Sequence, residues 1–296
     1  MKRNRQWISL SLLLMLLGAS IAAFKIIRLG YPTLPGTESV VWSVQARLYL
    51  EPDRGAVRAN LLLPSRPSGF NIAFENFISR GFGLTMEEET FSRQADWAIR
   101  RLREPKTLYY RALIIPDTRR RGFAPRPDYP TVPQLEEPFA TALKDIVNEV
   151  RSESADTESF AAAMLARLTG SEPDENMELF LADVTSEQDR VRLAQTLLAG
   201  AHIPTLQLHG LRLNEDTQRA DMENLLAVYN GDDWLVFNPR TAQQGLPRDY
   251  FIWWTGDREM VTVSSSSSTL SASGEIVMSN GTSGTRVIGF EMEIWA

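Results

Sequence analysis

The sequence contains no cysteine and only two histidines, His202 and His209. The absence of thiols excludes disulfide bonds, thiolate zinc sites, iron–sulfur sites and a cysteine nucleophile. Two histidines without a ligand-like spacing leave little room for a histidine-based metal site or triad, so we expect both to be structural or surface residues. The composition therefore predicts neither a metal nor a cofactor.

Positive charge is scarce beyond the N-terminus. The 296 residues include 37 Asp and Glu against 31 Lys and Arg, which gives a formal net charge of −6. The first 28 residues hold five basic and no acidic side chains, so the rest of the chain carries a net charge of −11. An acidic body repels phosphates, and we therefore expect no nucleic-acid partner.

One long apolar run stands at the N-terminus, where the 19 residues from Gln6 to Phe24 carry no charge. At about 1.5 Å per residue, a helix of this length crosses a bilayer. We predict a transmembrane anchor over residues 1–30, in contact with lipid through residues 6–24. Three basic residues precede the run and two follow it, a bias that favours a cytoplasmic N-terminus and an exported body.

A cleaved signal peptide is the main alternative to this anchor. The end of the run contains small residues that suit a cleavage site: Ala19, Ser20, Ala22 and Ala23. The apolar stretch is longer than the roughly 7–15 residues of a typical signal core, which favours the anchor. A buried helix of a soluble domain is the remaining alternative.

Residues 31–116 show the period-two alternation of half-buried strands. Apolar side chains occupy every second position in four stretches: 40–50, 57–63, 70–74 and 107–115. This pattern predicts a small, mostly antiparallel β domain. The segment 87–103 within it fits either a strand or a short helix.

Residues 117–138 are rich in proline and arginine. The segment holds five prolines, and three consecutive arginines, Arg119–Arg121, stand near its start. Proline at this density blocks helices and central strands, so we predict an extended linker. The arginines are typical of a solvated loop, with lipid headgroups or an acidic partner as the functional alternative.

Beyond the linker the hydrophobic period becomes helical. Three stretches repeat apolar residues at helical spacing: 139–150, 160–168 and 186–201. Strand-like segments follow at 205–213, 224–229, 233–238, 259–264, 274–279 and 286–295. Helices followed by strands predict an α+β fold, with a second domain over residues 139–296.

The stretch 188–239 has a distinctive order of motifs. A helix runs into Ile203-Pro204, a strand ends at Gly210, and two further strands lead to Asn238-Pro239. This order resembles the core of transglutaminase-like proteins. In that core a helix carries the nucleophilic cysteine, a strand starts with the histidine, and an Asp-Pro supplies the third member of the triad. The resemblance implies a papain-like α+β fold for residues 139–296.

Carried over position by position, the resemblance places the cysteine at Glu187, the histidine at Glu223 and the aspartate at Asn238. In such a triad a thiolate at a helix N-terminus pairs with the histidine, and the aspartate orients the histidine. With glutamate, glutamate and asparagine at these positions, the resemblance implies a degenerate triad and a pseudoenzyme.

Residues 42–110 are similar to the N-terminal region of one described family, the inactive transglutaminases fused to seven transmembrane helices. The similarity lies in four short motifs: Leu63-Pro64, Gly69-Phe70, Trp97 and Leu108–Tyr110. It implies a bacterial inner-membrane protein with a cytoplasmic N-terminus, a periplasmic body and a C-terminal membrane bundle. The sequence ends at Ala296 without a further apolar run, so we interpret the bundle as truncated or missing.

Three hypotheses of function follow. The first is a binding module for a peptide, an amino-acid conjugate or a partner membrane protein, with four aromatic residues as candidate cleft contacts: Trp234, Tyr250, Trp253 and Trp254. The second is a hydrolase or transferase with substituted chemistry, using Ser186 or Glu187 together with Glu223. The third is a purely structural scaffold for a membrane complex.

Overall fold

The computed structural model describes residues 13–18, 20, 24, 41–52, 55–117, 122–213, 222–266, 272–280 and 283–290. By their contacts, Val40–Ala296 form one compact unit and Met1–Ser39 form another. No helix among these described residues is long and apolar enough to cross a membrane. Most of the anchor predicted over residues 6–24 lies outside the described residues.

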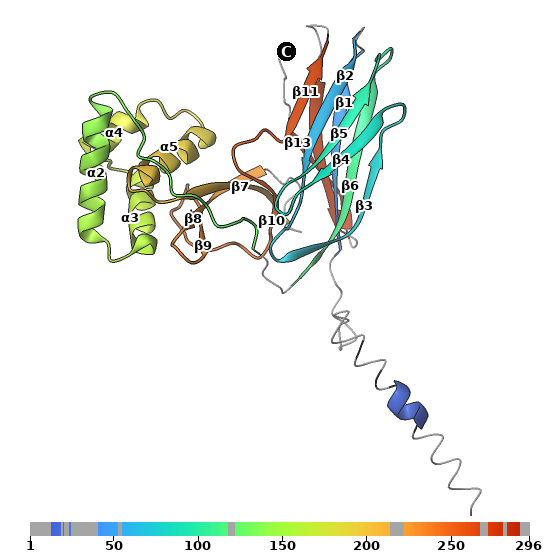
Figure 1. Ribbon diagram of the computed structural model, residues 1–296, viewed down its shortest axis with the longest axis horizontal. Helices are drawn as coiled ribbons and strands as arrows, with labels where there is room; N and C mark the ends of the chain where they lie inside the picture. The colour runs from blue at the N-terminus through green and yellow to red at the C-terminus, as the bar shows by residue number, and fades with distance from the viewer. Residues whose placement is uncertain are drawn as a thin grey trace, which may run out of the picture. The chain divides into compact units, whose positions relative to one another are not determined.

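Two antiparallel sheets build a β-sandwich in the larger unit (Figure 1). The first sheet has the order β13-β12-β1-β6-β3 and the second the order β11-β2-β5-β4. Their strands are β1 (Trp42–Leu50), β2 (Val57–Leu63), β3 (Phe70–Ile78), β4 (Gly83–Glu88), β5 (Arg93–Ile99), β6 (Lys106–Pro116), β11 (Val261–Ser265), β12 (Ala272–Asn280) and β13 (Ser283–Phe290).

The alternation of apolar and polar residues in the sequence predicts which side chains form the core of the sandwich. Every second side chain of β1 is buried, from Trp42 to Leu50, and these side chains join one apolar cluster with residues of β2, β5 and β6. The predicted strands at 40–50, 57–63, 70–74 and 107–115 are therefore confirmed. The segment 87–103, which fitted two structures, contains the end of β4 and the whole of β5 and no helix.

The C-terminal strands complete the sandwich. β12 pairs antiparallel with β1, with Ile276 opposite Ala46, and β11 pairs with β2, with Val261 opposite Leu61. The sequence predicts a β domain over 31–116 and a second domain over 139–296. In the structure, β11 and β12 lie within the predicted second domain but pair with strands of the sandwich. Strand periodicity shows which face of a strand is buried, but it carries no information about a pairing partner some two hundred residues away.

A third sheet, with the order β10-β7-β8-β9, carries four helices on one face (Figure 1). The helices are α2 (Phe139–Glu153), α3 (Thr157–Thr169), α4 (Glu175–Leu181) and α5 (Glu187–Gly200), and the strands are β7 (Thr205–Arg212), β8 (Met222–Tyr229), β9 (Trp234–Phe237) and β10 (Tyr250–Thr255). The predicted helices at 139–150, 160–168 and 186–201 are confirmed as α2, α3 and α5. The antiparallel sheets together with these helices give the expected mixture of α and β structure.

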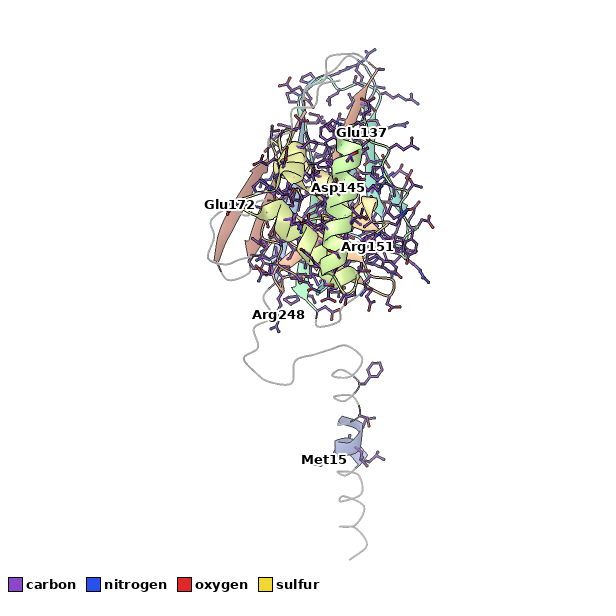
Figure 2. All side chains as sticks on the ribbon, turned by 90° about the vertical axis from the view of Figure 1, so that its left-hand side faces the viewer. Met15, Glu137, Asp145, Arg151, Glu172 and Arg248 are labelled. Atoms are coloured by element: carbon purple, nitrogen blue, oxygen red, sulfur yellow. The ribbon has the colours of Figure 1, made fainter. Side chains whose placement is uncertain are left out.

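The helical face has the amphipathic pattern that the sequence predicts. In α2, residues such as Ile146 and Val150 are buried, whereas Asp145 and Arg151 lie on the exposed face that is turned toward the viewer in Figure 2. At the start of α3, the Asp156 carboxylate accepts from the Ser159 backbone N–H and the Ser159 side chain completes the capping box. Short helices are only marginally stable in water, so these helices depend on the packing of their apolar faces against the sheet.

The sequence pattern does not predict strand β10, because both faces of this strand are buried. Phe251 and Trp253 belong to the sandwich core, whereas Tyr250 and Ile252 belong to the core on the helix-free face of the third sheet. A strand buried on both sides reads as a continuous apolar run, without the alternation that marks a half-buried strand. The Trp253 Nε1–H donates to the Leu62 carbonyl at 2.8 Å, which ties β10 to β2.

The proline-rich segment follows the surface of the third sheet and its helices. The Trp234 Nε1–H donates to the Pro125 carbonyl at 3.0 Å, and His202 Nδ1 lies 3.1 Å from the Pro130 carbonyl oxygen. Phe123 and Leu135 pack against the two cores of this part of the molecule. Residues 122–136 form neither helix nor strand, and these contacts hold them against the protein. Arg119–Arg121 lie outside the described residues.

Gly210 gives a test of the close approach between β7 and β10. A Cβ atom at this position would stand 2.3 Å from the Phe251 carbonyl oxygen and 2.7 Å from Cζ of Tyr250. We expect Gly210→Ala to lower the free energy of unfolding by about 1–3 kcal/mol, the usual cost of overpacking, in urea denaturation followed by tryptophan fluorescence. Gly83→Ala is the matched control in a strand, because its nearest atom would be 3.8 Å away. Equal stabilities of the two variants would contradict this packing.

Candidate functional site

The N-terminus of α5 lies over strands β7 and β8. Ser186 caps the helix, since its side chain accepts from the Asp189 backbone N–H and the Asp189 carboxylate accepts from the Ser186 backbone N–H at 3.0 Å. Short side chains with oxygen atoms are the preferred N-caps, which explains why the helix begins here. Leu197 and Leu198 are fully buried farther along α5 and hold the helix against the sheet.

The alternation of β8 decides which of its side chains face α5. Leu226 and Val228 belong to the core beneath the helices, whereas Leu225 and Ala227 belong to the core on the opposite face of the sheet. Because side chains alternate along a strand, Asn224 points toward the helices. Glu223 points the other way.

Strand β7 adds two polar side chains to the face beneath α5. In the antiparallel pairing, His209 stands opposite Asn224 and Gln207 stands opposite Leu226. Both His209 and Gln207 are buried, which is unusual for polar residues. Buried polar groups need hydrogen-bond partners, and α5 supplies two glutamines, Gln188 and Gln195.

These five side chains form one continuous chain of hydrogen bonds. His209 Nδ1 lies 2.7 Å from Asn224 Oδ1, and the Asn224 amide donates to Gln188 Oε1 at 3.3 Å. The Gln188 amide donates to Gln207 Oε1 at 2.9 Å, and the Gln207 amide donates to Gln195 Oε1 at 2.6 Å. The polar groups under the start of α5 thus satisfy one another.

His209 stands at the head of this chain. Its ring stacks on Trp254 with a centroid separation of 4.2 Å and an interplanar angle of 8°, and its Nε2 lies 2.9 Å from the Gly256 carbonyl oxygen. Burial lowers the pKa of His209 and outweighs the hydrogen bonds to Asn224 and Gly256 and the charge of Asp257, which raise it. The buried ring is therefore favoured in its neutral form.

The tautomer of His209 decides which of its two ring contacts carries the hydrogen. A neutral ring that donates from Nδ1 to Asn224 Oδ1 agrees with the amide directions given above. A second hydrogen on Nε2, toward the Gly256 carbonyl, is present only when the ring is charged.

Glu223 lies in a separate group of charged side chains on the opposite face of β8. Its Oε1 accepts from the Asn238 amide at 3.0 Å, and its Oε2 lies 3.4 Å from Arg212 Nε. Arg212 also pairs with Asp249 at 3.3 Å. Burial raises the pKa of Glu223, Arg212 lowers it, and the nearby charge of Glu187 raises it further.

The three degenerate triad positions therefore lie close together but do not form one triad. Glu223 and Asn238 are in direct contact, and the charge of Glu187 acts on Glu223. The side chains that meet between α5 and the sheet are instead Gln188 and Asn224, each one residue farther along the sequence. The alternation of Leu226 and Val228 in β8 is the sequence signal that points to Asn224 rather than Glu223.

The four candidate cleft aromatics separate into two groups. Tyr250 and Trp253 are buried in the two cores that flank β10, and Tyr250 has no exposed surface. Trp234 and Trp254 are partly exposed. Trp253 and Trp254 both line a surface hollow between β10 and the sandwich, and a role of these residues as ligand contacts stays a prediction.

Metal coordination receives no support from the part of the chain that the structure describes. No group of three or more histidine, aspartate and glutamate side chains converges there. The buried His209 has an amide and a carbonyl as its ring partners. Its arrangement is that of a hydrogen-bonded structural residue rather than a metal ligand.

Comparison with known proteins defines the class of this fold. A solved structure from Cytophaga hutchinsonii, described as a "putative cysteine protease", superposes with a TM-score of 0.54 at 12% sequence identity, over 86% of this chain and 95% of that chain. At this identity the likeness shows a shared fold and nothing more. No curated protein matches the chain by sequence.

The family follows from the sequence itself. Residues 24–184 match the family described as "Inactive transglutaminase fused to 7 transmembrane helices". Because the match spans more than half of the chain, the protein belongs to this family. The matched region includes the similar residues 42–110 and ends before α5, so the polar chain beneath α5 lies beyond it.

Introduced thiols test which residues face each other under α5. Because the chain has no cysteine, a new thiol is the only one present. In Gln188→Cys/Asn224→His, the thiol stands next to an imidazole at a helix N-terminus, an environment that favours the thiolate. At pH 6 we expect iodoacetamide to alkylate this variant at least about tenfold faster than Glu187→Cys/Glu223→His, the pair that the sequence alignment suggests. Equal rates, or the reverse order, would contradict the assigned faces.

The lowered pKa of His209 predicts a pH-dependent stability. The unfolded histidine takes up a proton near pH 6.5, while the buried ring stays neutral to lower pH, so the folded state loses stability as the pH falls through 6.5. Between pH 7 and pH 5, we expect the parent protein to lose more free energy of unfolding than His209→Gln does. The excess loss is about 1.4 kcal/mol for each unit by which the pKa is lowered. Urea denaturation at the two pH values measures it, and identical pH dependence would refute it.

Proposed function

We propose that this protein is a membrane-anchored, catalytically inactive transglutaminase-like module. Its body faces the periplasm and binds a peptide, an amino-acid conjugate or a partner membrane protein. The observation that carries the inactive part of the proposal is the chain of hydrogen bonds beneath α5. Carboxamides fill the space between the start of α5 and strands β7 and β8, where the resemblance to transglutaminase-like proteins leads us to expect the nucleophile and the base, and they bind one another.

A carboxamide replaces neither partner of a thiol–imidazole pair. Gln188 has no proton that it readily gives up and no lone pair that attacks a carbonyl, and Asn224 accepts no proton near neutral pH. The side chains of Gln188 and Asn224 are, in addition, already engaged with Gln207 and His209. Catalysis by this group would require breaking satisfied, partly buried hydrogen bonds and would still lack a nucleophile.

Two features support the anchoring and the orientation. The 19 uncharged residues from Gln6 to Phe24 suffice for one crossing of the bilayer, and three basic residues precede them. The description of the family includes seven transmembrane helices, which supports a membrane location for its members. Together these features favour a body on the far side of the membrane from the basic N-terminus.

A two-carboxylate enzyme is the second candidate, because the pKa of Glu223 is raised by its burial and by the nearby charge of Glu187. A carboxyl group that stays protonated to higher pH is what a general acid needs. Two observations weaken this candidate. Glu223 already binds Asn238 and Arg212, and the Ser186 hydroxyl is used in the cap of α5.

Activity assays separate the two candidates. We expect the full-length protein in detergent to show no amine incorporation and no peptide hydrolysis above the uncatalysed rate, because the covalent step has no nucleophile. The double variant Glu187→Gln/Glu223→Gln, assayed in parallel, serves as the control for the carboxylate mechanism. Turnover in the parent that disappears in this variant would establish the second candidate and overturn the inactive module.

A further inference from the structure

A surface hollow with an unusual charge pattern lies between β10 and the strands β2 and β5 of the sandwich. Three arginines line it, Arg66, Arg93 and Arg258, and none of its lining residues is acidic. Its apolar wall includes Phe91 and Trp254. On a body whose net charge is −11 beyond residue 28, a hollow lined by arginines without a carboxylate is a distinct local feature.

One of the three arginines is already neutralised. Arg93 pairs with Glu75, with an Nη2–Oε2 distance of 2.8 Å, and its Nε lies 3.4 Å from Oε1 of Glu88. It also donates to the Pro64 carbonyl at 2.9 Å. Arg93 therefore holds the neighbouring loop in place, and its charge is compensated within the protein.

The other two arginines have neutral partners. The Arg258 guanidinium donates to the Ser92 hydroxyl and, at 3.4 Å, to Gln94 Oε1. The Arg66 guanidinium carbon lies 5.3 Å from the centroid of the Phe91 ring, in a cation–π contact. Among the residues that the structure describes, neither arginine forms an ion pair with a carboxylate.

The wall beside Arg258 is held in a fixed position. The Trp254 Nε1–H donates to the Arg258 carbonyl at 3.0 Å, and the ring of Trp254 stacks on His209. One side of the hollow thus rests on the buried polar chain under α5. A guanidinium group held by hydrogen bonds loses less side-chain entropy on binding an anion, because it is already positioned.

We propose that this hollow, whose volume of about 20 Å³ admits one small group, receives the carboxylate group of a peptide, while the side chain next to that carboxylate lies outside at its mouth, beside Trp254 and Phe91. The proposal rests on the binding function proposed above and assigns it a site and a ligand chemistry. Guanidinium groups match carboxylates in charge and in planar geometry, and the aromatic wall suits an apolar neighbour. The acidic remainder of the body disfavours long polyanions, which leaves a short peptide with a local negative charge.

Peptide binding to the full-length protein in detergent tests the site. The probes are N-acetyl-Ala-Ala-Phe with a free C-terminal carboxylate, the same peptide as its C-terminal amide, and N-acetyl-Ala-Glu-Phe-amide, which carries its carboxylate on a side chain. Calorimetry gives the affinities, and the indole N–H resonance of Trp254 reports contact with the hollow. We expect binding of at least one carboxylate peptide, with a shift of this resonance, and at least tenfold weaker binding of the amide without a carboxylate.

Substitutions in the hollow distinguish this site from any other. Arg258→Met and Arg66→Met remove charge and keep most of the apolar stem, and we expect each to weaken binding of the carboxylate peptide at least fivefold. Within the described part of the chain, the Arg66 side chain contacts the Phe91 ring and forms no hydrogen bond, so its substitution leaves the hydrogen bonds of the loop intact. Arg248→Met is the matched control, an exposed arginine outside the hollow, and should leave the affinity unchanged.

Three results would overturn the proposal. The first is equal binding of the amide and carboxylate peptides. The second is peptide binding that is unaffected by both arginine substitutions, which would leave the binding function standing at another place. The third is inorganic phosphate binding more tightly than the carboxylate peptides, which would make this a phosphate site. The activity assays test the proposed function separately, because turnover in those assays would contradict it whatever the result of the peptide binding.

Discussion

Burial of polar side chains between α5 and its sheet is the constraint on which the site depends. A buried amide or imidazole without a hydrogen-bond partner costs about 1–3 kcal/mol, so the polar residues there must be matched as a set. Asn224, Gln188, Gln207 and Gln195 meet this requirement by forming a single file that starts at His209. Loss of one member leaves its neighbours unsatisfied, and the group therefore acts as a unit. The space between α5 and the sheet therefore holds carboxamides and one imidazole that bind one another.

Strand β10 connects this site to the sandwich. Phe251 and Trp253 enter the sandwich core from one face of the strand, and Tyr250 and Ile252 enter the core behind the third sheet from the other. At the end of the strand, Trp254 contacts His209 on one side and borders the arginine-lined hollow on the other. A ligand in that hollow would thus rest on an aromatic ring whose position depends on the buried polar chain. The buried polar chain and the arginine-lined hollow thus share one aromatic side chain, Trp254.

Local sequence patterns predict the individual helices and strands of this fold better than they predict which strands pair. The alternation from Val40 to Leu50 and the helical spacing from Phe139 to Val150 gave β1 and α2 because one face of each is buried. The pairing of β12 with β1 joins segments more than two hundred residues apart and leaves no local signal. The order of motifs around Ile203-Pro204 identified the helix and strands that build the site, and Glu223 and Asn238 do meet. Choosing between Glu223 and Asn224 required the face of β8, and an error of one residue reverses the face.

The central claim is that the polar side chains under α5 form a closed chain of hydrogen bonds that starts at the buried His209. The exchange of the side-chain amide hydrogens of Gln188, Gln207 and Asn224 with water, followed by NMR in the ¹⁵N-labelled protein, tests it most directly. The account predicts slower exchange for all three amides than for exposed side-chain amides, because each of the three donates within the chain. Exchange of Gln188 and Gln207 as fast as that of exposed amides would show that the chain is open and would contradict the account.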